Sequence, residues 1–338
     1  MKRNIVQFLF KNKQVLLIIP ALFLLFIILA IRSCVTGASS DSFEFDKSAE
    51  LLVDLKDKNQ VDKLKDLLKK YDAKVLQAFP HVQDDDITEL DDFYTVDVED
   101  QATVAKIIEE INNSGLADEI EYNESYQLSP IEQKADESNE DSNFKLNSLN
   151  DPFVSKLWGF ELMDIDKLAS EIKSAKPKRK AKIFILDTGI DAGHEDISNN
   201  YVSLSKKYDE DTGLHGTHCA GIAGAVSNNK KGIASLNFTG DFTTITSITV
   251  LPSGFGTQEA IIDGIILAAD NGADVISMSL GGPSSDKRQR AYEQAIEYAN
   301  KKGAIIVVAA GNANENALKH VPASCKGVIT VSAVVQAI

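Results

Sequence analysis

The sequence is poor in cysteine and in basic residues. Its 338 residues contain three cysteines, which are too few and too scattered for the disulfide framework of a small secreted domain. Lysine and arginine total 35 against 50 acidic residues, which gives a formal net charge of −15. A nucleic-acid-binding face needs clustered positive charge, so this composition argues against nucleic acid as a partner.

One long apolar run lies near the N-terminus. Residues 15–31 contain no charged side chain, and residues 1–14 before them are basic. At about 17 residues the run is short for a membrane-spanning helix and long for the core of a signal peptide. The basic flank places residues 1–14 in the cytoplasm and everything after residue 35 outside. We therefore expect a single-pass membrane protein, or a secreted one if residues 1–38 are cleaved.

Residues 41–128 have the pattern of a small independent domain. Two runs carry apolar residues at helical spacing, near residues 61–68 and 104–111. Four segments are typical of strands: 51–55, 73–79, 93–98 and 117–122. The resulting order, βαββαβ, predicts a split βαβ sandwich. Residues 129–149 are polar and acidic, which is typical of a linker.

Residues 150–338 alternate apolar strands with helices. The strands are expected near 182–187, 243–250, 273–279, 304–310 and 327–333, and the helices near 215–226, 257–271 and 288–302. Because the strands are almost continuously apolar, they should be buried on both faces. This pattern predicts the α/β class, with a doubly wound parallel sheet.

Two segments of this second domain carry the pattern of an acid–base pair. Asp187 closes an apolar run and precedes Thr-Gly, so its carboxylate should lie at the carboxyl edge of a strand. His215 opens a run rich in alanine and glycine that is expected to be helical. An aspartate that holds a histidine in one tautomer is what a serine nucleophile needs to lose its proton.

Four motifs resemble, in order and spacing, those of the subtilisin-like serine endopeptidases. They are DTGID at 187–191, HGTHCAG at 215–221, SLGGP at 279–283 and AAGN at 309–312. The histidine segment is most similar to the proteinase K branch. One such motif alone would indicate only a tight turn, whereas four in register make a specific match.

The resemblance implies roles for individual residues. Asp187 would orient His215, and His215 would be the general base in preference to His218, which is expected to pack inward. The side-chain amide of Asn312 would stabilise the oxyanion of the tetrahedral intermediate. Cys219, next to the histidine motif, is interpreted as a small buried apolar residue.

The resemblance also implies a peptide-binding cleft. Two glycine-containing segments would hold an extended substrate between them as an added strand, because glycine lets a peptide backbone approach closely. The substrate-binding residues expected from the match are Ser279, Leu280, Gly281, Gly282, Gly254 and Gly256.

No cofactor is implied beyond a structural calcium ion. Asp196 matches an aspartate that ligates calcium in many members of the family, and residues 226–231 match a loop that supplies further oxygens. Lys230 and Lys231 in that loop do not favour a divalent cation.

The position of residues 41–128 resembles that of the propeptides of this family, which assist folding and block the cleft until they are removed. An ordinary α+β domain with no inhibitory role is the alternative. The family's nucleophile motif, Gly-Thr-Ser, is not recognisable in the sequence, so we expect a fragment of a longer enzyme that lacks activity by itself. The alternative is a non-catalytic module that binds peptides or inhibits a related protease.

Overall fold

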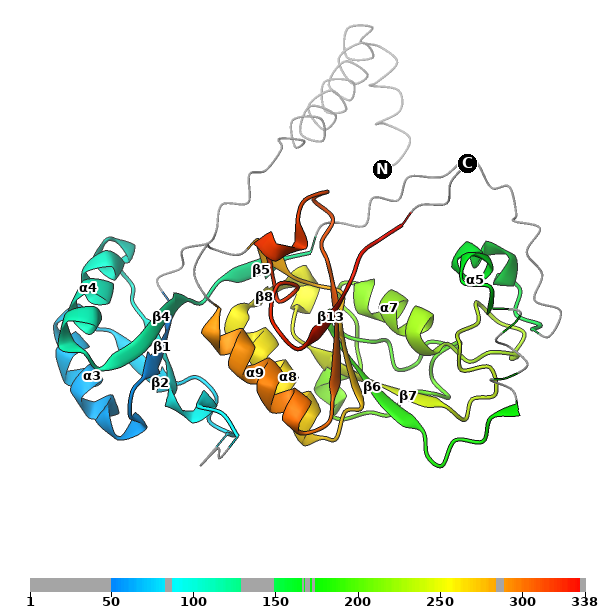
Figure 1. Ribbon diagram of the computed structural model, residues 1–338, viewed down its shortest axis with the longest axis horizontal. Coiled ribbons are helices and arrows are strands. Elements are labelled where there is room, and N and C mark those ends of the chain that lie inside the picture. The colour runs from blue at the N-terminus through cyan, green and yellow to red at the C-terminus, as the bar shows by residue number, and fades with distance from the viewer. Residues whose placement is uncertain are drawn as a thin grey trace, which may run out of the picture. The chain divides into compact units, whose positions relative to one another are not determined.

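The structure is a computed structural model that describes residues 50–82, 87–128, 149–165, 167, 171, 174–283 and 289–334 (Figure 1). The predicted membrane segment 15–31 and nearly all of the predicted linker lie outside the described residues. Within the ranges just given, no helix is both long and apolar enough to span a bilayer.

The N-terminal domain has the predicted order of elements. Its sheet has the strand order β2-β3-β1-β4, and all of its pairs are antiparallel. The elements are β1 (Glu50–Leu55), α3 (Val61–Leu68), β2 (Lys74–Gln77), β3 (Phe93–Asp97), α4 (Val104–Ser114) and β4 (Ala117–Tyr122). Alternate residues of β1, such as Leu51 and Val53, pack against Leu64 and Ile107 of the two helices. The βαββαβ prediction is therefore confirmed for residues 50–122.

A short strand that the sequence pattern did not reveal follows this domain. β5 (Ser125–Gln127) pairs antiparallel with β8 (Phe255–Thr257), more than a hundred residues further along the chain. Three residues are too few for a periodic pattern to be recognised, so only the tertiary pairing defines this strand.

The second domain is built on a five-stranded parallel sheet with the order β13-β11-β9-β6-β7. Its strands are β6 (Ala181–Asp187), β7 (Thr243–Thr249), β9 (Val275–Met278), β11 (Ile305–Ala309) and β13 (Val328–Val331). The main helices are α7 (His215–Gly224), α8 (Gln258–Asp270) and α9 (Arg290–Lys301). Every predicted strand and helix of this domain is confirmed, with ends that shift by a few residues.

Smaller elements connect these. They are α5 (Trp158–Leu162), β10 (Gly282–Pro283), β12 (His320–Val321) and 3-10 turns at Lys58–Gln60, Lys69–Tyr71, Leu90–Asp92, Gln101–Thr103, Val154–Lys156, Lys206–Tyr208, Pro252–Gly254 and Ala317–Lys319. β10 and β12 pair antiparallel with each other.

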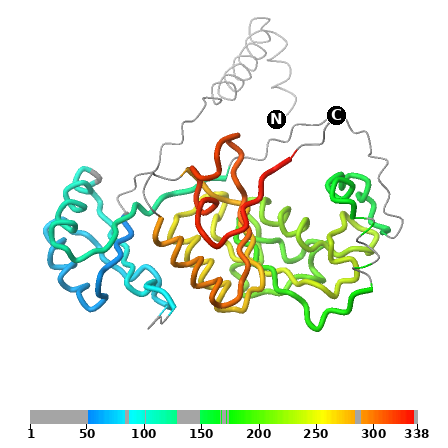
Figure 2. The backbone as a smooth tube through the Cα atoms, in the orientation of Figure 1, coloured from blue at the N-terminus to red at the C-terminus, as the bar shows by residue number. Residues whose placement is uncertain are grey.

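Helices lie on both faces of the parallel sheet, but unequally. α8 and α9 run side by side and cover one face (Figure 2). On the other face α7 contacts β6 and β7. On that same face of β11 and β13, however, Ile305, Ile329 and Val331 are 51%, 55% and 50% exposed. The prediction that all strands are buried on both faces is therefore wrong for β11 and β13, because α7 covers only the β6 and β7 end.

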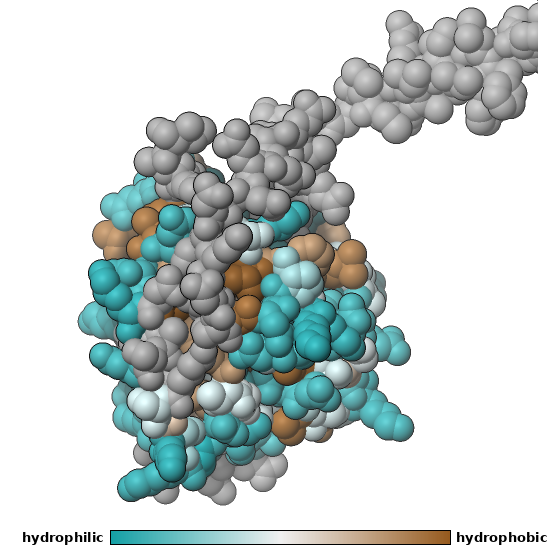
Figure 3. Space-filling view, turned by 90° about the vertical axis from the view of Figure 1, so that its right-hand side faces the viewer, coloured by the Kyte–Doolittle hydropathy of each residue, from teal (hydrophilic) through white to brown (hydrophobic). Residues whose placement is uncertain are grey.

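The surface carries both polar and apolar side chains. On the face shown in Figure 3, polar side chains predominate and hydrophobic side chains form separate areas. Scattered apolar exposure of this kind is ordinary for a folded protein.

Candidate active site

Asp187 lies where the sequence predicts it, at the last position of β6, which lies between β9 and β7 in the parallel sheet. Its side chain is fully buried, and the backbone N–H of Thr188 donates to Oδ1 at 2.7 Å. Neighbouring strands run parallel to β6, so their carboxyl ends meet at this same edge of the sheet.

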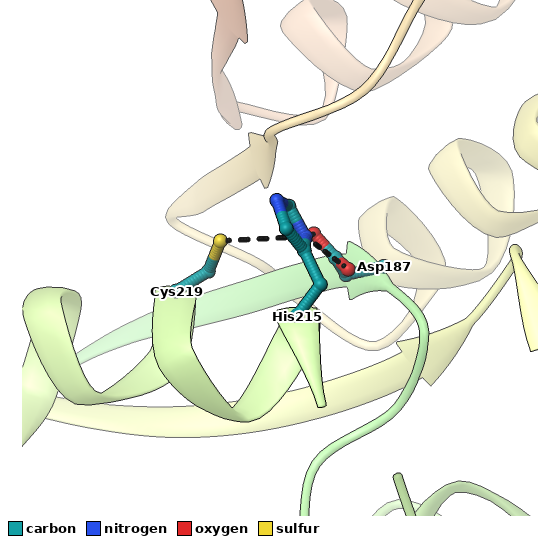
Figure 4. Close-up of side chains that lie close together, drawn as sticks. All are labelled: Asp187, His215 and Cys219. Carbon is teal, nitrogen blue, oxygen red and sulfur yellow. Dashed lines mark hydrogen bonds and ion pairs between the residues drawn. The ribbon is translucent and has the colours of Figure 1, made fainter. Parts of the chain in front are cut away.

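His215 is the first residue of α7, and its ring faces Asp187 (Figure 4). Nδ1 lies 2.8 Å from Oδ1 and 2.9 Å from Oδ2 of Asp187. Because an ionised carboxylate can only accept, Nδ1 carries the proton, and Nε2 of the neutral ring keeps a free lone pair. Figure 4 shows Nε2 pointing away from the carboxylate. The pair is therefore arranged for His215 to accept a proton at Nε2.

The electrostatics of the pair favour the protonated form of His215. The hydrogen bond to Asp187 raises the pKa of His215 above its ordinary value, with a smaller contribution from Cys219, and partial burial opposes the rise. The imidazolium that forms after proton transfer is thus stabilised by a buried carboxylate. The side chain of His215 is still 23% exposed, which leaves it accessible to a substrate.

Cys219 has a different environment from the one predicted. It lies one turn after His215 on α7, and its Sγ is 3.7 Å from Nδ1 (Figure 4). In the part of the chain that the structure describes, Asp187, His215 and Cys219 are the group of potential metal ligands whose atoms lie close together. We assign no metal to it, because Nδ1 is engaged with the carboxylate at hydrogen-bond distance. His218 is exposed, so the prediction that it packs inward is wrong.

The predicted substrate segment at Gly254 and Gly256 is occupied by the chain itself. Tyr126 of β5 is paired with Gly256, and the N–H of Leu128 donates to the carbonyl of Gly254 at 2.9 Å. The Tyr126 side chain is only 2% exposed, and a Cβ added to Gly282 would lie 2.5 Å from its ring. Glycine at position 282 is therefore what allows the aromatic ring to lie against the backbone.

The other predicted residues lie at the same edge of the sheet. Ser279 and Leu280 follow β9, and Leu280 is buried in the main core. Gly281 has a φ of +147°, and a Cβ there would lie 2.7 Å from the carbonyl oxygen of Val321. Asn312 follows β11 and is exposed. The parallel sheet thus brings the segments after β6, β9 and β11 to one edge.

Asp196 is satisfied by protein donors. Its carboxylate accepts from Asn229 Nδ2 at 2.7 Å and from the N–H of Ile233 at 2.8 Å. A Cβ at Gly232 would lie 2.1 Å from Oδ2, so the loop also packs tightly against it. These contacts account for the buried carboxylate with no cation, and calcium at Asp196 stays a prediction.

One hydrogen-bond network next to the Asp187–His215 pair was not identified from the sequence. Asp211, Thr188 and Thr217 form a hydrogen-bond network around the start of α7. In the sequence this network is marked only by Thr188 and Thr217, one in each motif, and by Asp211, four residues before His215.

Comparisons with known proteins agree with this geometry. The model of the subtilase family matches residues 178–337. Thermitase from Thermoactinomyces vulgaris is 43% identical over 158 residues, which are 45% of this chain and 54% of that protein. Subtilisin DY from Bacillus licheniformis is 37% identical over 186 residues, covering 52% of this chain and 64% of the relative. The chain thus spans roughly half to two thirds of the length of these two relatives.

One solved structure is similar over a larger part of the chain. It is the epidermin leader peptide processing serine protease from Staphylococcus aureus, with a TM-score of 0.55 and 21% identity. The match covers 83% of this chain and 68% of that one. At this identity the likeness shows a shared fold, and it extends beyond residues 178–337.

Proposed function

Since residues 178–337 belong to the subtilase family, we propose that the protein is a subtilisin-like serine endopeptidase, made with its own propeptide. The observation that carries this proposal is the pair of contacts at 2.8 and 2.9 Å between His215 Nδ1 and the buried carboxylate of Asp187. Such a pair is built to activate a hydroxyl nucleophile.

Each residue has a defined step in the proposed reaction. His215 Nε2 takes the proton of the serine hydroxyl as its oxygen attacks the peptide carbonyl, and Asp187 stabilises the resulting imidazolium. The amide of Asn312 donates to the oxyanion, and a donor in that position is worth about two to three orders of magnitude in turnover. His215 then gives the proton to the leaving amine, and water hydrolyses the acyl-enzyme by the same route.

The attacking serine is not assigned within the 338 residues. The family's Gly-Thr-Ser motif is not recognisable among them, and the matched relatives extend beyond the aligned regions. We therefore propose that the nucleophile is the serine of a Gly-Thr-Ser segment outside these 338 residues, as the resemblance to the family implies.

Labelling with a serine-directed fluorophosphonate tests this assignment. The 338-residue polypeptide should not be labelled, whereas a chain extended through a Gly-Thr-Ser segment should be, and His215→Ala in the longer chain should abolish labelling. Stoichiometric labelling of the 338-residue form that depends on His215 would contradict the assignment, because a serine within it would then be the nucleophile.

The proposed substrate is an extended polypeptide that pairs with β8. β5 supports this, because it binds β8 as an added antiparallel strand through Tyr126 and Leu128. A substrate would use the same backbone groups of Gly254 and Gly256. In this proposal residues 41–128 are the propeptide, and β5 blocks the cleft until the propeptide is removed.

A non-catalytic role is the second candidate. The pairing of β5 with β8 would equally suit a module that binds peptides or inhibits a related protease. Labelling of the extended chain distinguishes the two, because a non-catalytic module remains unlabelled in every form.

The remaining proposals concern location and ions. We propose that residues 15–31 anchor the protein with residues after 35 outside the cytoplasm, or that the protein is secreted after cleavage near residue 38. Digestion of intact cells with an added protease should remove the peptidase domain and spare residues 1–14. The opposite pattern of digestion would exclude this orientation.

A structural calcium ion at Asp196 would be detected as a calcium-dependent rise in Tm, abolished in Asp196→Ala.

A further inference from the structure

The carboxylate of Asp211 accepts five hydrogen bonds. Oδ1 accepts from the Thr188 hydroxyl at 2.7 Å and from the N–H groups of Gly213 and Leu214 at 2.9 and 2.8 Å. Oδ2 accepts from the N–H and the hydroxyl of Thr217 at 2.8 and 2.6 Å. Five donors are more than the roughly four lone-pair sites of one ionised carboxylate, so Asp211 has no free acceptor site.

These donors come from both sides of the active-site pair. Thr188 directly follows Asp187 at the end of β6, and Thr217 lies in the first turn of α7, two residues after His215. The Thr188 hydroxyl also accepts from the N–H of Gly216 at 2.9 Å. Gly216 is the residue directly after His215. Asp211 therefore connects the strand that carries Asp187 to the helix that carries His215.

The backbone before His215 needs such support. Leu214 has a φ of +63°, a left-handed conformation that is unfavourable for a bulky side chain, and its side chain is 73% exposed. Packing of that exposed side chain therefore does little to hold this conformation. The N–H of Leu214 instead donates to Asp211. Asp211 also accepts from Thr217 N–H, one of the amide groups that a helix start leaves without a partner.

The charge state of Asp211 suits this role. Partial burial alone would raise the pKa of Asp211, but the hydrogen bonds from Thr217 and Thr188 hold it below its ordinary value. The carboxylate is therefore ionised at neutral pH, and its hydrogen bonds are of the stronger, charge-assisted kind.

We propose that Asp211 is a positioning residue, which sets the distance and orientation between Asp187 and His215 through Thr188 and Thr217. It touches neither the substrate nor the proton that His215 transfers. This inference rests on the proposed role of His215 as the general base.

Histidine-selective NMR on the full 338-residue chain tests the proposal without any need for a nucleophile. The chain has five histidines, and His215→Ala identifies the signal of His215. In the unsubstituted protein we expect a low-field resonance for the Nδ1 proton shared with Asp187 and a raised pKa for His215. In Asp211→Ala the low-field resonance should be lost, and the pKa of His215 should fall by about one unit or more toward its ordinary ~6.5.

Asp209→Ala is the matched control. Asp209 lies in the same loop, but its carboxylate accepts from the hydroxyl groups of Tyr201 and Ser203, at 2.8 and 2.9 Å, rather than from the donors that surround Asp211. Both NMR signatures should survive this substitution. If Asp211→Ala does not fold, Thr217→Val removes one hydroxyl donor of the network and should still lower the pKa of His215.

Three results would contradict these ideas, and they can be told apart. A folded Asp211→Ala variant that keeps the resonance and the raised pKa would refute the positioning role and leave the proposed function intact. Equal effects from Asp209→Ala and Asp211→Ala would indicate a general loss of loop structure and also refute it. An ordinary pKa and no low-field resonance in the unsubstituted protein would overturn the proposed base, and the inference with it.

Discussion

Tyr126→Ala should release β5 from β8. The Tyr126 side chain is 2% exposed, its ring lies against Gly282, and its hydroxyl donates to Glu124 at 3.1 Å. Truncating a well-packed buried aromatic side chain costs about 3–5 kcal/mol. Since about 1.4 kcal/mol corresponds to a factor of ten in an equilibrium constant, opening of β5 should become at least about a hundredfold more frequent.

Hydrogen exchange at the Leu128 amide measures this opening. That amide donates to the carbonyl of Gly254 at 2.9 Å and exchanges only when β5 leaves β8. Exchange should accelerate at least about a hundredfold in Tyr126→Ala. In Tyr126→Phe, which loses only the hydroxyl, it should accelerate about five- to tenfold, because a single hydrogen bond is worth about 1 kcal/mol.

Gln127→Ala serves as the control, because Gln127 is exposed although it lies in the same strand. Its exchange rates should stay within about threefold of the unsubstituted protein, as expected for a surface change within about ±0.5 kcal/mol. Unchanged protection of Leu128 in Tyr126→Ala would refute the reasoning. It would mean that backbone pairing alone, and not burial of the tyrosine ring, holds β5 against β8.

Three further predictions concern the N-terminal domain and the active-site pair. Purified residues 41–128 should inhibit an active subtilisin-like protease in a titration, and no inhibition at high micromolar concentration would exclude the propeptide assignment. Arg290→Ala should lower the free energy of unfolding in urea by up to about 3–5 kcal/mol above pH 7, because it leaves the buried carboxylate of Asp54, 2.5 Å from Arg290 Nε, without its cation. The loss should be smaller at acid pH, because burial raises the pKa of Asp54 to about 7 and the side chain is then protonated. A loss below about 1 kcal/mol above pH 7, or no recovery in the double variant with Asp54→Ala, would show that this ion pair does not stabilise the folded protein. The pKa of His215 is raised in the folded state, so its pairing with Asp187 stabilises the folded protein. This stabilisation is fully present below the ordinary histidine pKa and is lost as the pH rises through the raised pKa. The difference in unfolding free energy between the unsubstituted protein and His215→Ala should thus be larger near about pH 6 than in alkaline solution, and a difference that grows with pH would contradict this sign.

The sequence by itself determined the elements and singled out Asp187 and His215, which the structure brings together. Apolar residues at helical or strand spacing are a local signal, and they were sufficient for the βαββαβ order of residues 50–122 and for every main strand and helix after residue 180. Asp187 and His215 were recognisable because each sits in a short motif at the end or start of such an element.

The tertiary structure decided what depends on contacts between distant segments. β5 has no periodicity of its own and exists as a strand only because β8 lies beside it. The five donors to Asp211 come from two motifs and the loop between them, and no spacing rule predicts that they converge on one carboxylate. The position of Cys219 beside His215 and the exposure of Ile329 on β13 likewise depend on which helix covers which face. Local sequence encodes periodicity, whereas the partner of each polar group and the cover of each apolar face are set only when the whole chain is packed.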